Sequence, residues 1–247
     1  MFRDRRGVSE TVGFVLVFSL VLLTVGTVFT VGYGGLQDAR DAERINNAER
    51  AFDVLVDNIG DITARGAPSR GTEIRLAEAS IGPGPPTLLN VTGYESGSIA
   101  FSTGNFSLDS IVYEASDTRI RYAGGTVTRI QPDGSLMLQE PNFVVSETRV
   151  IIPVIQLSVE DRTIAGSRTV LVRSERRIRS VEVDENGVDE LRIELSSPVA
   201  DRWAAYFEGQ GMDCSWPNGV DGDRIACETT GLERVQIVHF EIAVAFG

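Results

Sequence analysis

The chain has 247 residues, of which 42% are hydrophobic, so it is long enough to form one or two domains with sizeable cores. Its formal net charge is −12, and all 23 basic residues are arginine, because the sequence contains no lysine. An acidic surface keeps a protein soluble by self-repulsion, as in halophiles, and argues against nucleic acid as a partner, since neutralising phosphates requires a basic face.

The first predicted element is an apolar run over residues 11–37, which contains no charged side chain. As a helix rising 1.5 Å per residue, the run would be roughly 40 Å long, which exceeds the ~30 Å thickness of a bilayer core. Arg3, Arg5 and Arg6 precede the run and Asp38 follows it. The positive-inside bias therefore predicts a single-pass protein of the cell membrane with a cytoplasmic N-terminus and an extracellular C-terminal domain.

Three kinds of N-terminal segment could contain this run: a cleaved secretory signal, a plain signal anchor and a prepilin-type leader. A secretory signal is disfavoured, because its apolar core is only about 7–15 residues long and is followed by a small-residue cleavage pattern that is missing here. A plain anchor stays open, since basic residues before an apolar run are all that an anchor needs.

A basic stretch, a glycine and an early carboxylate lie directly before the run, which reads RRGVSETVG over residues 5–13. This stretch resembles the class III signals of archaeal type IV pilins and archaellins. The resemblance covers residues 3 to about 36, and the continuation to residue 65 is similar to haloarchaeal pilin-like secreted proteins. One departure is that Glu10 lies two positions nearer to the expected cleavage site than the early glutamate of bacterial pilins.

The resemblance implies a leader over residues 1–7 that a prepilin peptidase removes by cutting between Gly7 and Val8. The apolar helix would then remain in the mature protein. It further implies that Glu10 takes part in assembly with other pilin-like subunits.

Beyond the apolar run, the pattern predicts that the helix continues as an amphipathic stalk, so that the helical domain spans residues 8–66. Gly66 and Pro68 are expected to end it. Apolar residues recur at alternating spacings of three and four, at Leu36, Ala39, Ala42, Ile45, Ala48, Phe52, Leu55, Ile59 and Ile62. This stripe must be covered, either by a globular domain or by the other helices of an independent stalk or coiled coil.

The remaining residues, 67–247, are predicted to form a β-rich extracellular domain. Strands are expected over 73–80, 87–91, 99–102, 110–115, 119–122, 126–130, 135–138, 150–158, 168–173, 179–183, 190–196 and 235–246. Turns are expected at 83–86, 124–125, 132–134 and 186–187. This regular spacing favours an antiparallel, sandwich-like arrangement or a wide sheet, so the predicted fold class is α+β.

One short helix is expected among the late strands, over residues 198–208, with Trp203 on its apolar face as a core residue. The final strand alternates apolar residues on one side and carries the single histidine, His239, on the other. We interpret His239 as an ordinary strand residue, because the sequence has no second histidine with which it could form a base or ligand pair.

The two cysteines, Cys214 and Cys227, lie in a segment rich in glycine, asparagine and aspartate. On the external side of a membrane, a disulfide between them is the simplest expectation. Asn218, Asp221 and Asp223 lie within the same loop and offer oxygen ligands for Ca²⁺. They lack the spacing of an EF-hand, so turn residues are the better interpretation and no metal site is predicted.

Two N-glycosylation sequons, N-V-T and N-F-S, make Asn90 and Asn105 candidate attachment sites for glycans. A basic cluster stands out in this acidic chain and consists of Arg173, Arg176, Arg177 and Arg179. We interpret it as a charged strand edge that discourages pairing; the alternative is a surface that binds acidic glycans.

The sequence shows no catalytic pattern: it has no Cys–His pair, no metal-spaced histidines, no phosphate-binding glycine loop and no G-x-S-x-G. We therefore expect neither an enzyme nor a cofactor. The resemblance favours a structural cell-surface protein, a major or minor subunit of a type IV pilus-like filament, with the membrane, a prepilin peptidase and other pilin-like subunits as partners. The alternative is a membrane-anchored extracellular module that binds glycans or proteins and does not polymerise.

Overall fold

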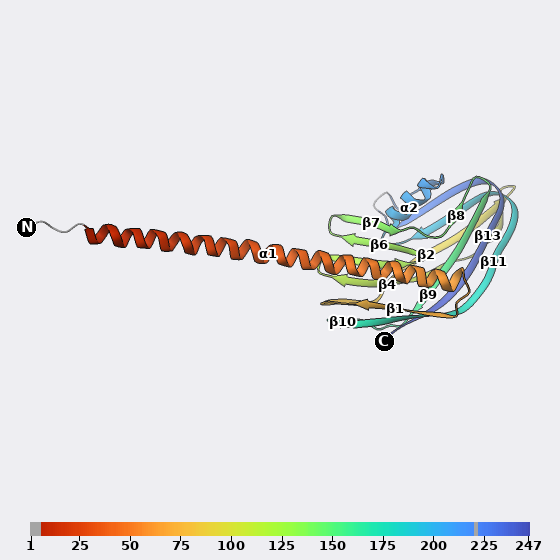
Figure 1. Ribbon diagram of the computed structural model, residues 1–247. Helices are drawn as coiled ribbons and strands as arrows, with labels where there is room; N and C mark the ends of the chain where they lie inside the picture. Colours follow the sequence, from red (N-terminus) through yellow and green to blue (C-terminus); the bar gives the residue numbers. More distant parts are fainter. Residues whose placement is uncertain (1–5, 220–221) are drawn as a thin grey trace, which may run out of the picture. The chain divides into compact units, whose positions relative to one another are not determined.

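Figure 1 shows the computed structural model of the chain, which describes residues 6–219 and 222–247; of residues 6–10 and Asp38 it describes the backbone only. The structure contains one long helix, α1 (Arg6–Thr63), a sheet of 13 strands and a short helix, α2 (Ala200–Gly209). It divides into two compact units within α1, one ending at Asn46 and the other running from Asn47 to Gly247. The predicted α+β class is therefore confirmed.

The first half of the sheet consists of β1 (Ser69–Arg75), β2 (Ala79–Glu95), β3 (Ser98–Ser102), β4 (Phe106–Ala115), β5 (Thr118–Ala123), β6 (Thr126–Gln131) and β7 (Gly134–Gln139). The second half consists of β8 (Val144–Val145), β9 (Arg149–Val159), β10 (Ile164–Gly166), β11 (Thr169–Ser196), β12 (Asp213–Ser215) and β13 (Arg224–Phe246).

All strands belong to one hydrogen-bonded sheet, not to the two separate sheets of a sandwich. The main path has the order β7-β6-β5-β4-β2-β11-β13-β9-β8, with β1 added to β11, β3 and β10 to β2, and β12 to β13. The described pairings are antiparallel except for that of β13 with β9, which is parallel. The wide-sheet alternative thus describes the domain better than the sandwich-like one.

The second part of α1 is a core element of the sheet domain. The apolar stripe is buried from Ala48 onward, and Phe52, Leu55, Ile59 and Ile62 are each at most 1% exposed. Asn58 Nδ2 donates a hydrogen bond to Thr72 Oγ1 of β1 at 2.9 Å. The sheet domain therefore covers this part of the stripe, and the interpretation as an independent stalk or coiled coil is wrong for it.

The predicted end of α1 is confirmed, since the helix stops at Thr63, just before the expected breakers. Gly66 has φ +79°, a left-handed conformation that glycine adopts without a Cβ clash. The chain reverses here, and the amide of Ala67 donates back to the carbonyl of Asp61 at 3.0 Å.

Two of the four predicted turns are wrong, because two long strands run through them. β2 continues across residues 83–86. A register shift between Gly84 and Thr87 leaves Pro85 and Pro86 outside the regular pairing, which suits them because proline has no N–H group to donate. β11 continues across residues 186–187, where Gly187 has φ +69° within the strand. The turns at 124–125 and 132–134 are confirmed and connect β5, β6 and β7 as an antiparallel meander.

The face of the sheet that is buried changes along the length of its strands, and β9 shows this change. Val150, Ile152 and Val154 are buried at alternate positions, and the next buried residues are Ile155 and Leu157. Because successive side chains of a strand point to opposite faces, the buried face changes between Val154 and Ile155.

Each helix covers one of these faces. The three even-numbered residues of β9 belong to a cluster with α2, in which Trp203 and Phe207 are fully buried, as predicted for Trp203. On the other face, Leu157 pairs with Ile242 of β13, and this strand continues to Phe246, which pairs with Val172. Val172 in turn pairs with Thr72, the residue that α1 contacts. The domain therefore has two cores, one under each helix.

Candidate functional site

The apolar part of α1 is the first candidate site. The described side chains of residues 11–37 are all exposed, including Leu16 at 65% and Phe29 at 73%. This helix near the N-terminus is long and apolar enough to span a membrane. Large apolar side chains on all sides of a helix require a cover that the described residues do not supply, and lipid or neighbouring helices would provide one.

Threonine hydroxyls within this apolar segment are satisfied locally. The hydroxyls of Thr24, Thr27 and Thr30 donate to carbonyl oxygens four residues earlier, at 3.0, 2.8 and 2.6 Å. These bonds pair all three donors inside the helix, which matters in a low-dielectric environment, where an unsatisfied group costs several kcal/mol. This part of α1 is therefore suited to an apolar environment.

The residues predicted for cleavage and assembly lie in the first turns of α1. The backbone of Gly7, Val8 and Glu10 is helical, and their side chains are outside the described part of the structure. The leader residues 1–5 are outside it as well. Cleavage and the role of Glu10 stay predictions.

Several polar contacts fix the second part of α1 to the sheet. Arg129 Nη1 of β6 pairs with Glu49 Oε1 at 2.8 Å, and Arg70 Nε of β1 pairs with Asp61 Oδ2 at 3.0 Å. The Nη1 of an arginine in β11, Arg176, donates at 3.3 Å to a carbonyl oxygen near the end of α1, where the helix dipole favours a positive charge. Together these contacts set the rotation of the helix on the sheet.

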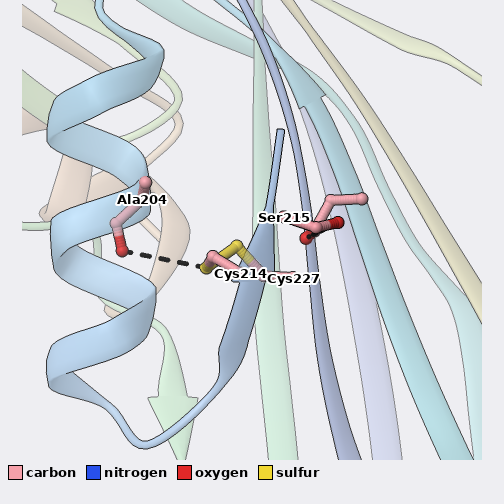
Figure 2. The surroundings of a disulfide bond; sticks show 5 residues. Ala204, Cys214, Ser215 and Cys227 are labelled. Carbon is pink, nitrogen blue, oxygen red and sulfur yellow. Dashed lines mark hydrogen bonds between the residues drawn. A yellow bond between two sulfur atoms is a disulfide. The ribbon is translucent and has the colours of Figure 1, made fainter. Parts of the chain in front are cut away.

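The disulfide predicted between Cys214 and Cys227 is present and joins β12 to β13 at directly opposed positions. Figure 2 shows it between these strands and α2, with Cys214 Sγ lying 3.8 Å from the carbonyl oxygen of Ala204. Ser215 Oγ donates to the carbonyl of Ala226 at 3.2 Å and closes the short strand pair. The bond thus holds the loop after α2 against the core that α2 covers.

Removing this disulfide is expected to lower the free energy of unfolding by about 3 kcal/mol, because it joins two cysteines with a sequence separation of 13 and so closes a loop in the unfolded chain. The double variant Cys214→Ala with Cys227→Ala should show this loss in denaturant unfolding of the full chain in detergent. Wild-type protein kept in reductant is the matched control and should show a similar loss. Free thiols in protein purified without reductant would contradict the expectation.

The two sequons have different surroundings. Asn105 is exposed in the loop between β3 and β4. Asn90 is half-buried in β2, where its Nδ2 lies 3.4 Å from Glu194 Oε2 and its Oδ1 accepts from Ser102 Oγ at 3.4 Å. Nδ2 is the atom to which a glycan is attached, so the position of Asn90 is unfavourable for modification of the folded domain.

We therefore expect a glycan at Asn105 and none at Asn90. Intact-mass measurement on protein from its natural host should show a loss of glycan mass for Asn105→Gln and unchanged mass, apart from the substitution, for Asn90→Gln. A loss of glycan in the Asn90 variant alone would contradict the structural argument, and so would unmodified wild-type protein.

The basic cluster lies on β11, which is a central strand and not an edge. Arg173 is in the part of β11 that has β1 on one side and β13 on the other. The stretch 177–189 has β13 on one side only in the described pairings, and the β11–β13 register shifts twice along β11. Such bulges twist an open stretch away from further pairing, and Arg177 and Arg179 add charge there. The edge interpretation thus holds for part of the cluster only.

The metal-binding potential of the described residues can be judged from how their side chains are placed. Within residues 6–219 and 222–247, no group of three His, Cys, Asp or Glu side chains is placed to hold a metal ion. Asp221 of the disulfide loop lies outside these residues. His239 Nε2 lies 3.0 Å from Gln156 Oε1 on the neighbouring strand β9, and its Nδ1 lies 3.6 Å from Glu182 Oε1 of β11.

A cavity of about 340 Å³ lies on the sheet where β2, β4 and β5 meet. Its wall includes a buried arginine, Arg121, and is completed by Ser80, Gly82, Pro83, Gly84, Pro85, Val112, Glu114, Arg119, Ile130, Thr163 and Pro198. Burial lowers the pKa of Arg121 to about 10, so its guanidinium stays charged at neutral pH. No signal in the sequence marks this site, because Arg119 and Arg121 occupy equivalent alternate positions along β5.

The model of a family of unknown function, DUF7289, matches residues 6–245. The chain belongs to the DUF7289 family. No curated protein and no solved structure matches it. The DUF7289 match begins at the start of α1 and extends into β13, so it covers both the apolar helix and the sheet domain.

In this DUF7289 chain, the sequence predicted the sites whose residues lie close together along the chain. It did not predict the contacts between residues that lie far apart along the chain. The cysteine pair and the apolar helix are visible in the sequence itself. Glu49 and Arg129 lie 80 positions apart, and Arg121 bonds to Thr87 34 positions away. Only the pairing of strands brings these side chains together.

Proposed function

We propose that this DUF7289 protein is a structural cell-surface protein, a pilin-like subunit of a type IV pilus-like filament. The observation that carries the proposal is the division of α1. One continuous helix is apolar and exposed over residues 11–37, and its second part is built into the core of the sheet domain. A helix of this kind supports a role in which its first part is buried among lipids or neighbouring helices while the domain is displayed.

The charges at the two ends of the apolar run support an orientation with the N-terminus in the cytoplasm and the sheet domain outside. Three arginines precede the run, and acidic residues follow it. The disulfide also favours an external domain, because disulfides persist in oxidising surroundings and are rare in the cytosol.

Processing by a prepilin peptidase is part of the proposal. Cutting after Gly7 would remove the basic leader and leave Val8 as the first residue, with a new ammonium group next to the apolar run. The mature protein would keep its helix, which distinguishes it from a protein with a cleaved secretory signal.

N-terminal sequencing of the membrane-extracted protein tests this step, and we expect the mature chain to begin at Val8. Gly7→Val should leave the precursor uncut, whereas Gly13→Val should be processed normally, because Gly13 lies beyond the cleavage site and a Cβ there would meet no described atom within 4 Å outside its chain neighbours and the helix backbone. An intact wild-type N-terminus, or one beyond residue 32, would contradict the proposal. Processed protein that never appears in sheared filaments would favour a membrane-anchored binding module.

A further inference from the structure

The cavity is lined by a buried charge, that of Arg121, which no described carboxylate neutralises. Arg121 is 2% exposed, and its Nη2 donates to the carbonyl of Pro85 at 3.0 Å and to Thr87 Oγ1 at 2.8 Å. Its Nε and Nη1 are buried and have no hydrogen-bond partner among the described residues. Both acceptors that it does use are uncharged.

The acidic residue in the cavity wall is already engaged. Glu114 Oε1 pairs with Arg119 Nε at 3.0 Å, and Arg119 is largely exposed. No carboxylate of the described residues forms an ion pair with Arg121. A buried charge without a counter-charge is costly, and this chain has an excess of acidic residues from which a partner could have been drawn.

The dimensions and chemistry of the cavity indicate what would fill it. Its volume of about 340 Å³ is at the lower end of the range of small-molecule sites and is several times the ~30 Å³ that one water molecule occupies. Ser80 and Thr163 provide hydroxyl groups in the wall, and Pro83, Val112 and Pro198 provide apolar surface. One unpaired cation matches a ligand with one negative charge.

We propose that this cavity binds a small hydroxylated monocarboxylate of the sugar-acid class, with the carboxylate held by Arg121 and the hydroxyl groups facing Ser80 and Thr163. An arginine guanidinium is well suited to a carboxylate, because charge-assisted hydrogen bonds are about twice as strong as neutral ones. The site lies within the sheet domain and does not depend on filament assembly.

Calorimetric titration of the full chain in detergent with glucuronate, glucose and inorganic phosphate tests this proposal. Glucuronate should bind, and glucose, which has the same ring without the carboxylate, should bind at least tenfold more weakly. Phosphate should also bind at least tenfold more weakly, because it has no hydroxylated ring to fill the rest of the cavity. Equal binding of glucose or phosphate, or no binding of glucuronate, would overturn the proposal.

Two variants and one control locate the ligand. Arg121→Gln should weaken glucuronate binding at least tenfold, whereas Arg119→Gln, on the same strand and already paired with Glu114, should change it less than threefold. Thr163→Phe keeps the buried arginine and places a ring at the exposed wall of the cavity, so it should also weaken binding at least tenfold. If Arg121→Gln fails to fold, Thr163→Phe still tests the site. Unchanged glucuronate binding in Thr163→Phe would then overturn the assignment.

Discussion

Replacing Phe52 by alanine is expected to lower the free energy of unfolding of the sheet domain by about 3–5 kcal/mol. Phe52 lies in the part of α1 that belongs to the sheet domain, and its side chain is 0% exposed. Truncation removes a buried ring from a core between a helix and a sheet, and the hydrogen-bonded backbone of the strands cannot collapse into the space. A loss of this size approaches the total stability of many domains.

Val54→Ala is the matched control, because Val54 lies two positions away on the same helix and is 50% exposed. It should change the free energy of unfolding by less than about 0.5 kcal/mol, since surface substitutions rarely have larger effects. Denaturant unfolding of the full chain in detergent, followed by the tryptophan signal of the domain, measures both. Equal effects of the two variants would mean that α1 is not part of the core.

The second large effect is expected for Glu10→Gln, which should leave leader cleavage and membrane insertion intact but remove most filaments. After cleavage, the Val8 ammonium and Glu10 are the charges at the start of the apolar run, and a charge in the membrane costs at least ~2.5–3.5 kcal/mol. Within one helix, groups two positions apart do not face each other. A neighbouring subunit, shifted along the filament, would supply the partner.

Filaments sheared from cells and quantified by immunoblot provide the measurement. Glu43→Gln is the control, because Glu43 is exposed on the same helix beyond the apolar run, and it should assemble at the wild-type yield. A Glu10 variant that yields as many filaments as the wild type would disprove the pairing.

The helices were predictable because their signals are local. The uncharged run over residues 11–37 and the stripe through Phe52 and Ile62 set the course of α1, and Gly66 set its end. The strands were less predictable, because their length depends on neighbours. Asn186-Gly187 has the composition of a hairpin turn, yet β13 pairs with β11 on both sides of it and keeps the strand continuous.

The candidate sites also divide into those that were predictable from the sequence and those that depend on neighbouring strands. Cys214 and Cys227 could be paired from the sequence, since no other cysteine competes. The difference between Asn90 and Asn105 could not be predicted, because it depends on Glu194, which β11 places beside β2. The cavity at Arg121 is lined by several segments of the chain, and no sequence motif in any of these segments predicts it.

The position of β13 determines when the domain can fold. This strand lies between β11 and β9, and among the described strand pairings only β13 connects β9 and β8 to the rest of the sheet. The sheet cannot be completed before β13 has been synthesised, because β11 and β9 pair with its two sides, and non-local pairing of this kind is slow. Until β13 has been synthesised, the apolar stripe of α1 and the open strands lack part of their cover, and exposed apolar surface of this kind favours aggregation. A chain that ends before residue 224 would expose these surfaces permanently and be a substrate for quality-control proteases.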